Sequence, residues 1–277
     1  MIYLTVPRLL LNKCKSDFPI DVLKYMKANA TPTMALKLMF YSKYFLHQVF
    51  PYTVVKLVRP FLGELYYYQT LNGEFHEWIS SAGIPSNLWI TSSIETQTKS
   101  IQNAVSYLLS KTVVCDINKL ELFNQTITVK EFKFLGHVLK DFDMRLSRIL
   151  KENDETLTLE DIFECLPHIE KMRIQSPLPS FSSITAAKEI YCSTLRSLYV
   201  TFSLPNDNFD IESFMEFIKK HQEIEFLINR IGKSVFPYTD VLQKFVDEMS
   251  KSGTELNISF YGQRKKSKTS TTPQPHY

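Results

Sequence analysis

The sequence is poor in glycine, the residue on which phosphate-binding loops depend. Only seven glycines occur in 277 residues. Glycine allows positive φ and a close approach of the backbone to a ligand, so a glycine-rich nucleotide-binding loop has little material here. The catalytic patterns HExxH, GxSxG, GxxxxGK and DFG are also missing. These absences argue against the common motif-bearing enzyme classes.

Long apolar runs are missing as well. No segment approaches the roughly 18 to 20 consecutive apolar residues that a membrane-spanning helix needs. A short apolar run over 6–11 has no basic region before it, so we expect no signal peptide. We therefore predict a protein that does not bind or cross membranes.

Cysteine and histidine are scattered without the spacing of a metal site. The four cysteines (Cys14, Cys115, Cys165 and Cys192) form no CxxC pair, which predicts reduced, mostly buried thiols in a cytosolic or nuclear protein. Cys165 and His168 lie three residues apart on a predicted helix, but Cys165 falls on its apolar face, where a buried and inert thiol is expected. We predict no enzymatic activity, no cofactor and no bound metal.

Positive charge is concentrated at the C-terminal end of the sequence. Residues 262–277, GQRKKSKTSTTPQPHY, carry four of the basic residues and no acid, and removing them changes the net charge from +3 to −1. The nearly neutral remainder predicts no nucleic-acid partner. The polar 262–277 segment is typical of a disordered basic tail. We expect a cytoplasmic protein, or a nuclear one if RKKSK acts as an import signal.

Short segments with alternating apolar residues recur in the second half of the chain. Their leading apolar residues are spaced by 26, 26, 26, 28 and 30 residues. Periods of 20–29 residues are typical of leucine-rich repeats, which supply one strand and one helix per repeat. The leading positions are Leu120, Leu146, Met172, Leu198, Phe226 and Leu256.

Helical patterns fill the intervals between these segments. Thr128 with Glu131 forms a predicted capping box, and Asp210 precedes a stripe of apolar residues at helical spacing. Strand, helix and strand at a steady period predict parallel strands with the helices on one side. The fold class we predict is α/β: an irregular β/α, leucine-rich-repeat-like horseshoe over 119–261. An open doubly wound α/β sheet is the alternative.

The neighbours of the inward residues on each strand are expected on the uncovered concave face, which solenoids commonly use for binding. Basic and aromatic residues among them would lie on adjacent strands, although a solvated face without a ligand fits them equally well. The candidate target-binding residues are Arg145, Lys171, Arg173 and Tyr199.

Residues 51–118 have weaker patterns. PYTVVKLV and PSNLWITSSIE are typical of strands, and QTKSIQNAVSYLLS is typical of a helix. We interpret this region as degenerate first repeats or a connector.

The stretch DFPIDVLKYMKANATPTMALKLMFYSKYF, residues 17–45, predicts two short amphipathic helices. Thr31 before Pro32 is a strong helix start. Two helices of this size have little core of their own, so their apolar residues must be buried against the rest of the chain or another protein.

This stretch resembles the F-box, and with the repeats behind it the chain resembles divergent nematode F-box-like proteins. FPIDVLKYM is similar to the proline-led first helix and LMFYSKYF to the end of the second, with Phe18 and Ser42 departing from the usual leucine and cysteine. The resemblance covers about residues 7 to 50. It implies a Skp-type adaptor docking on Phe18, Pro19, Ile20, Val22, Leu23, Met26, Leu36, Leu38, Tyr44 and Phe45.

These patterns predict an F-box-like helical segment over 1–50, the connector over 51–118, the repeat region over 119–261 and the tail over 262–277. The resemblance implies a substrate receptor that links an unknown protein target to a cullin–RING ubiquitin ligase. A binding scaffold without a ubiquitin link is one alternative. A small-molecule enzyme on an α/β sheet is the other.

Overall fold

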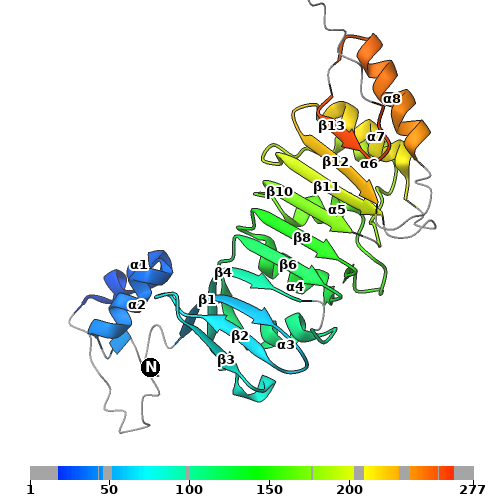
Figure 1. Cartoon of the computed structure of the whole chain (residues 1–277). Coiled ribbons are helices and arrows are strands. Elements are labelled where there is room, and N and C mark those ends of the chain that lie inside the picture. Colours follow the sequence, from blue (N-terminus) through cyan, green and yellow to red (C-terminus); the bar gives the residue numbers. More distant parts are fainter. Residues whose placement is uncertain are drawn as a thin grey trace, which may run out of the picture. The chain divides into compact units, whose positions relative to one another are not determined.

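A computed structural model describes residues 18–42, 44–45, 52–97, 100–175, 177–202, 209–230, 238–254 and 256–264 (Figure 1). It is a mixed α/β structure with mostly parallel strands, and its described part contains eight α-helices. The chain divides into two compact units, 1–117 and 118–277. The predicted tail falls almost wholly outside the described residues, as do residues 1–17.

The first unit begins with the two predicted helices, α1 (Ile20–Asn29) and α2 (Pro32–Tyr41). Thr31 starts α2 as predicted, because its side-chain oxygen accepts a 3.3 Å hydrogen bond from the backbone nitrogen of Met34. One side of this helix pair is buried against the sheet that follows it. The buried cluster contains Leu23, Ala35, Met39, Phe45 and Trp89.

The strands of the first unit form a mixed sheet. A hairpin of β2 (Tyr66–Gln69) and β3 (Phe75–Trp78) pairs antiparallel with β1 (Thr53–Pro60). On its other side β1 pairs parallel with β4 (Leu88–Glu95), which pairs parallel with β5 (Thr112–Cys115). A 3-10 turn, η2 (Ser81–Gly83), lies between β3 and β4, and α3 (Ala104–Lys111) lies between β4 and β5. The predicted strands and helix of 51–118 are present, and the hairpin is an addition.

The second unit is a ladder of parallel strands in the order β6, β8, β10, β11, β12 and β13. Apolar side chains face the helices at matching positions, so that Leu120, Phe142, Met172, Leu198 and Phe226 lie opposite one another in register. All five are buried. The strand bounds are β6 (Lys119–Phe123), β8 (Asp141–Arg145), β10 (Lys171–Gln175), β11 (Ser197–Phe202), β12 (Glu225–Arg230) and β13 (Ile258–Phe260).

Helices connect successive strands and lie along one face of this ladder (Figure 1). The Thr128–Glu131 capping box is present, a second one pairs Thr158 with Asp161, and Asp210 accepts hydrogen bonds from two first-turn amides. Phe132 and Phe217 pack the helices against the sheet. Their rings contact those of Phe142 and Phe226, respectively. The helices are α4 (Val129–Gly136), α5 (Leu159–Cys165), α6 (Ile184–Glu189), α7 (Ile211–Lys220) and α8 (Thr239–Lys251).

The second predicted strand was wrong in position. Leu146 is not in a strand: its φ is +51° and its side chain is exposed. The ladder strand is β8, five residues earlier, where Phe142 and Met144 point inward. The segment after Leu146 is β9 (Arg148–Leu150), which pairs with β7 (Thr126–Thr128) in a separate two-stranded sheet. The last leading residue also shifts, since Ile258 rather than Leu256 pairs with Phe226.

Candidate protein-interaction surfaces

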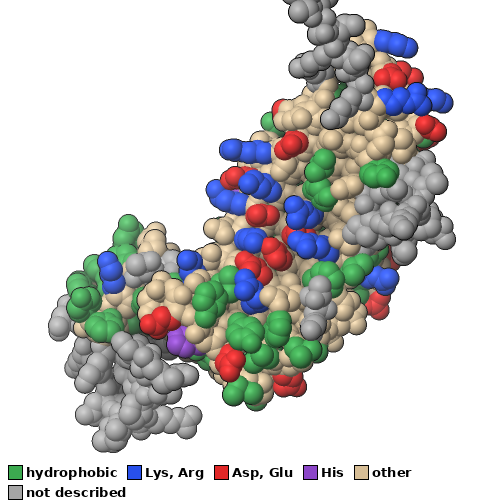
Figure 2. Space-filling view, viewed as in Figure 1, with side chains coloured by type: hydrophobic (Ala, Val, Ile, Leu, Met, Phe, Trp, Pro, Cys, Tyr) green, Lys and Arg blue, Asp and Glu red, His purple; other side chains and the backbone are tan. Residues whose placement is uncertain are grey.

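The face of the second unit's sheet opposite the helices carries alternating charges. Side chains of Lys and Arg are interleaved with Asp and Glu over β6, β8 and β10 (Figure 2). The register places Lys119, Asp141 and Lys171 in one row across these strands, and Glu121, Asp143 and Arg173 in the next. We call this face the open face. It carries Lys119, Glu121, Asp141, Asp143, Arg145, Lys171, Arg173 and Tyr199. Ser147, which the misplaced strand put on it, is buried and accepts a hydrogen bond from the backbone of Gln125.

Asp143 is the anchor of this charged surface. Its carboxylate binds two guanidinium groups, that of Arg145 on its own strand and that of Arg173 on the neighbouring one. The Nε of Arg145 donates at 2.8 Å and the nitrogen of Arg173 lies at 3.4 Å. The hydrogen bond to Asp143 raises the pKa of Arg145 above its ordinary value. Because the Asp143 side chain is only 8% exposed, it is available to the two arginines rather than to solvent.

Arg173 also stacks on an aromatic ring. Its guanidinium carbon lies 4.9 Å from the centre of the Tyr199 ring on β11, within the range of a cation–π contact. The Tyr199 hydroxyl accepts a 3.0 Å hydrogen bond from the side-chain amide of Asn229 on β12. Side-chain contacts across four strands, β8, β10, β11 and β12, therefore hold Arg173 and its neighbours in place.

The row of Lys119, Asp141 and Lys171 is held less firmly by side-chain contacts. Lys119 forms a 2.7 Å ion pair with Glu121 on the same strand. Burial raises the pKa of the Asp141 carboxyl above its ordinary value, while the charges of Lys119 and Lys171 oppose that rise. Lys171 is exposed, and within the described residues its side chain forms no hydrogen bond or ion pair, although its charge acts on Asp141 and Glu170. It is the cation of this face with the greatest freedom to meet a ligand.

The four predicted target-binding residues are brought together. Arg145, Lys171, Arg173 and Tyr199 lie on the adjacent strands β8, β10 and β11 and point to the same face. The acids between them were missed, because placing the second strand at Leu146 left Asp141 and Asp143 in an unassigned segment. The alternation of Phe142 and Met144 between charged residues was the signal for the correct strand.

A second surface lies on the helix pair of the first unit. Both helices also expose large apolar side chains that do not belong to the buried cluster, and green side chains lie over the two helices in Figure 2. Ile20 is 69% exposed and Phe40 is 70% exposed, on different helices. The full set is Phe18, Ile20, Val22, Tyr25, Met34, Phe40 and Tyr41, which we call the helix-pair patch.

The residues assigned to adaptor binding by resemblance divide into three groups. Phe18, Pro19, Ile20 and Val22 are exposed. Leu23 and Phe45 are buried within the unit, in the cluster with Trp89. The remaining four are partly buried against that cluster: Met26, Leu36, Leu38 and Tyr44. Sequence reasoning missed the exposed aromatic residues Tyr25, Phe40 and Tyr41, whose spacing puts them outside the stripe that packs on the sheet.

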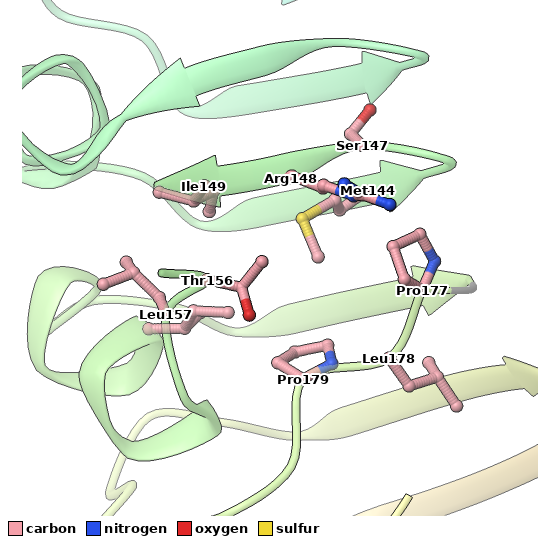
Figure 3. A pocket seen from close by; sticks show the side chains of 10 residues that line it. Met144, Ser147, Arg148, Ile149, Thr156, Leu157, Pro177, Leu178 and Pro179 are labelled. Atoms are coloured by element: carbon pink, nitrogen blue, oxygen red, sulfur yellow. The ribbon is translucent and has the colours of Figure 1, made fainter. Parts of the chain in front are cut away.

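A small pocket opens near the carboxyl ends of β8 and β10, where α/β enzymes commonly bind ligands (Figure 3). Its volume is about 40 Å³, room for a few water molecules since one needs roughly 10–15 Å³. Apolar side chains such as Met144, Leu157 and Pro179 dominate its lining, and Ser147, Arg148 and Thr156 are its polar members. Among the described residues no acid, histidine or cysteine lines it, so these walls offer no acid–base pair or nucleophilic thiol.

The thiols of the described part are enclosed. Cys115, Cys165 and Cys192 are buried and form no disulfide, as the sequence predicted for structural cysteines. Burial raises the pKa of Cys115 and of Cys192 to about 12, and it also raises the pKa of Cys165. No group of His, Cys, Asp and Glu within the described ranges is arranged to hold a metal ion. No helix there is both long and apolar enough to cross a membrane.

Comparison with known proteins adds no assignment. No protein-family model matches the chain, and no curated protein is significantly similar to it in sequence.

Proposed function

We propose that this chain is an F-box-like substrate receptor. In this proposal the helix-pair patch docks a Skp-type adaptor of a cullin–RING ubiquitin ligase. The strand–helix units of 118–277, an irregular leucine-rich-repeat-like array, hold a protein target on their open face. The mechanism is then to bring the target close to the ubiquitin-transfer machinery. It requires no catalytic group in this chain.

The two-sided helix pair is the observation that carries the proposal. Leu23 of α1 and Met39 of α2 anchor one side to Trp89, at 8% and 4% exposure. Outside this cluster the pair keeps Ile20, Phe40 and Tyr41 in solvent at 69%, 70% and 86% exposure. Exposed large apolar side chains grouped on one small element are typical of protein–protein interaction sites. The sequence resemblance to the F-box concerns these same two helices.

The open face supports the second half of the proposal. Its charged side chains are held by contacts within and between strands, such as those that Asp143 makes with Arg145 on its own strand and with Arg173 on the next. Concave faces of repeat arrays are extended binding surfaces, and side chains held in place lose little entropy on binding.

The test is binding of the full chain to a purified Skp-type adaptor, measured by isothermal titration calorimetry and size-exclusion chromatography. We expect a one-to-one complex. Ile20→Asp should weaken it by about tenfold or more, because a charge would be buried in an apolar contact. The matched control is Ile79→Asp, since Ile79 is 81% exposed in the same unit but lies just after β3.

Leu23 is unsuitable for this test, because a charge there would disrupt the buried cluster and unfold the helix pair. If the wild-type chain does not bind the adaptor, or if both aspartate variants weaken binding equally, the proposed role of the helix-pair patch is wrong.

A further inference from the structure

On the open face, Asp143 lies deeper than the two arginines that it binds. Over β6, β8 and β10 the face carries the cations Lys119, Arg145, Lys171 and Arg173 and the acids Glu121, Asp141 and Asp143. The Asp143 side chain is 8% exposed, whereas that of Arg173, which it binds, is 51% exposed. The carboxylate thus lies beneath the guanidinium groups.

This arrangement makes the outer layer positive around β10. Lys171 and Arg173 are both exposed, and Arg145 reaches the surface beside them with 36% of its side chain accessible. In the row of Arg173 the side chains of β11 and β12 add no charge, since they are Tyr199 and Leu227. In the row of Lys171 they are Ser197 and Glu225, so the nearest acid on that side lies two strands away. A ligand arriving from solvent meets cations first, although the net charge of the whole surface is small.

The two exposed cations Lys171 and Arg173 follow one another along β10. Lys171 and Arg173 are two residues apart on one strand, so their side chains leave the same face about 6.6 Å apart. An extended peptide also places alternate side chains on one face at this repeat. Acids at alternate positions of an extended segment would therefore match both cations.

Arg173 is prepared for such a ligand. The contact with the Tyr199 ring at 4.9 Å and the contact with Asp143 restrain its guanidinium, while about half of the side chain stays accessible. A guanidinium can bind a carboxylate through two parallel hydrogen bonds when its plane is held.

From these observations we infer that the open face binds an extended acidic segment of a protein partner, with carboxylates at alternate positions lying on Lys171 and Arg173 and with Arg145 beside them. This inference rests on the proposed function, since it gives the chemical class of the target. It depends only on the second unit and not on the helix-pair patch.

The experiment uses the full chain and a fluorescein-labelled peptide of twelve residues in which glutamate and serine alternate. Fluorescence anisotropy at low ionic strength should show saturable binding that weakens as salt rises. A peptide of the same composition, with its glutamates in one block and its serines in another, should bind more weakly because its acids lack the alternate spacing. A lysine–serine peptide should not bind.

Substitutions locate the site. Arg173→Glu and Lys171→Glu should each lower the affinity for the alternating peptide by about tenfold or more. Lys244→Glu makes the same change in net charge at an exposed position of α8 in the same unit, and it should change the affinity less than twofold. Arg173→Gln, which removes charge without reversing it, should give an intermediate loss. Circular dichroism checks that each variant is folded.

Several results would overturn the inference. They are absence of saturable binding, equal binding of the alternating and block peptides, and an equal effect of Lys244→Glu. A single-stranded oligothymidine that binds as tightly as the alternating peptide would identify a general polyanion surface instead. Normal adaptor binding without peptide binding would contradict this inference alone, whereas peptide binding without adaptor binding would contradict only the ubiquitin-ligase role.

Discussion

The indole nitrogen of Trp89 donates a 2.8 Å hydrogen bond to the carboxylate of Asp116, just beyond β5. The same ring meets Tyr52 edge-to-face, with 5.5 Å between ring centres, and belongs to the cluster that holds α1 and α2. One side chain therefore joins the end of a strand to the helix pair. We expect the attachment of the helices to depend on it more than on any contact within the pair.

Trp89→Ala should release the helix pair from the sheet. Removing a buried tryptophan typically lowers the free energy of unfolding by about 3–5 kcal/mol. Limited proteolysis should show faster cleavage within 18–45, and urea denaturation should show the loss of stability. Trp89→Phe keeps an apolar ring but loses the hydrogen bond to Asp116, so it should cost about 1–3 kcal/mol. A Trp89→Phe variant as stable as the wild type would contradict the hydrogen bond's contribution.

Leu23 and Ile20 form a matched pair on one helix, because one is 8% and the other 69% exposed. Leu23→Ala should lower the free energy of unfolding by about 2–4 kcal/mol, since it leaves a cavity beside Ala35 and Met39. Ile20→Ala should change it by less than about 0.5 kcal/mol. Urea titrations of the two variants give the comparison. Similar losses would mean that Ile20 is buried in solution, which would remove it from the helix-pair patch.

Gly136, the last residue of α4, is in close contact with the end of α5. A Cβ added there would lie 2.3 Å from the carbonyl oxygen of Cys165, a backbone atom that cannot rotate away. Gly136→Ala should therefore lower the thermal midpoint, at a cost of about 1–3 kcal/mol, despite alanine's better helix propensity. Gly83→Ala is the control, because the nearest atom to its added Cβ is 3.8 Å away. A neutral Gly136→Ala would show that α4 and α5 separate easily.

Alkaline pH should destabilise the chain through its buried thiols. Burial raises the pKa of Cys115 from 9.0 to about 12, so the unfolded state loses this proton at a lower pH than the folded state. Stability is therefore complete below pH 9 and falls between pH 9 and 12, by about 1.4 kcal/mol per pH unit for a fully buried thiol. Cys115→Ala should make the dependence of the urea midpoint on pH less steep over this range.

The rate of alkylation is an independent test that the buried thiols are protonated and enclosed. At pH 8 in native protein, Cys115 and Cys192 should react with iodoacetamide far more slowly than after denaturation, because both stay protonated and enclosed. Peptide mapping by mass spectrometry assigns the modified cysteines. Rapid native labelling of Cys192 would show that its surroundings open readily.

The alternation of apolar residues predicted most strands of the repeat region, including β6 and β12, which carry the acids Glu121 and Glu225. Met172, Leu198 and Phe226 lead three strands as expected, and their register is uniform. β8 was missed because Asp141 and Asp143 flank Phe142, and aspartate usually disfavours strands. Here the side-chain contacts of Asp143 with two arginines offset that preference, and such partners come from tertiary structure rather than from local sequence.

The candidate surfaces were predictable to different degrees. Residues on alternate strand positions share a face by geometry, so Arg173 and Tyr199 were found together. The depth of Asp143 beneath the arginines was not predictable, because it depends on which side chains cover it. On the helix pair, the pattern identified both helices but not which apolar residues each of them buries. Leu23, unlike Ile20, is buried in the cluster that contains Trp89, which lies more than 60 residues away in the sequence.

The uniform register of the parallel ladder has an evolutionary consequence. Phe142, Met172, Leu198 and Phe226 meet residue for residue, and each strand touches only its two neighbours. Duplication or deletion of a whole strand–helix segment would keep every remaining inward position facing inward, whereas a single inserted residue would invert a strand. Descendants of such a gene can therefore lengthen, shorten or rewrite the exposed rows quickly while the buried rows persist.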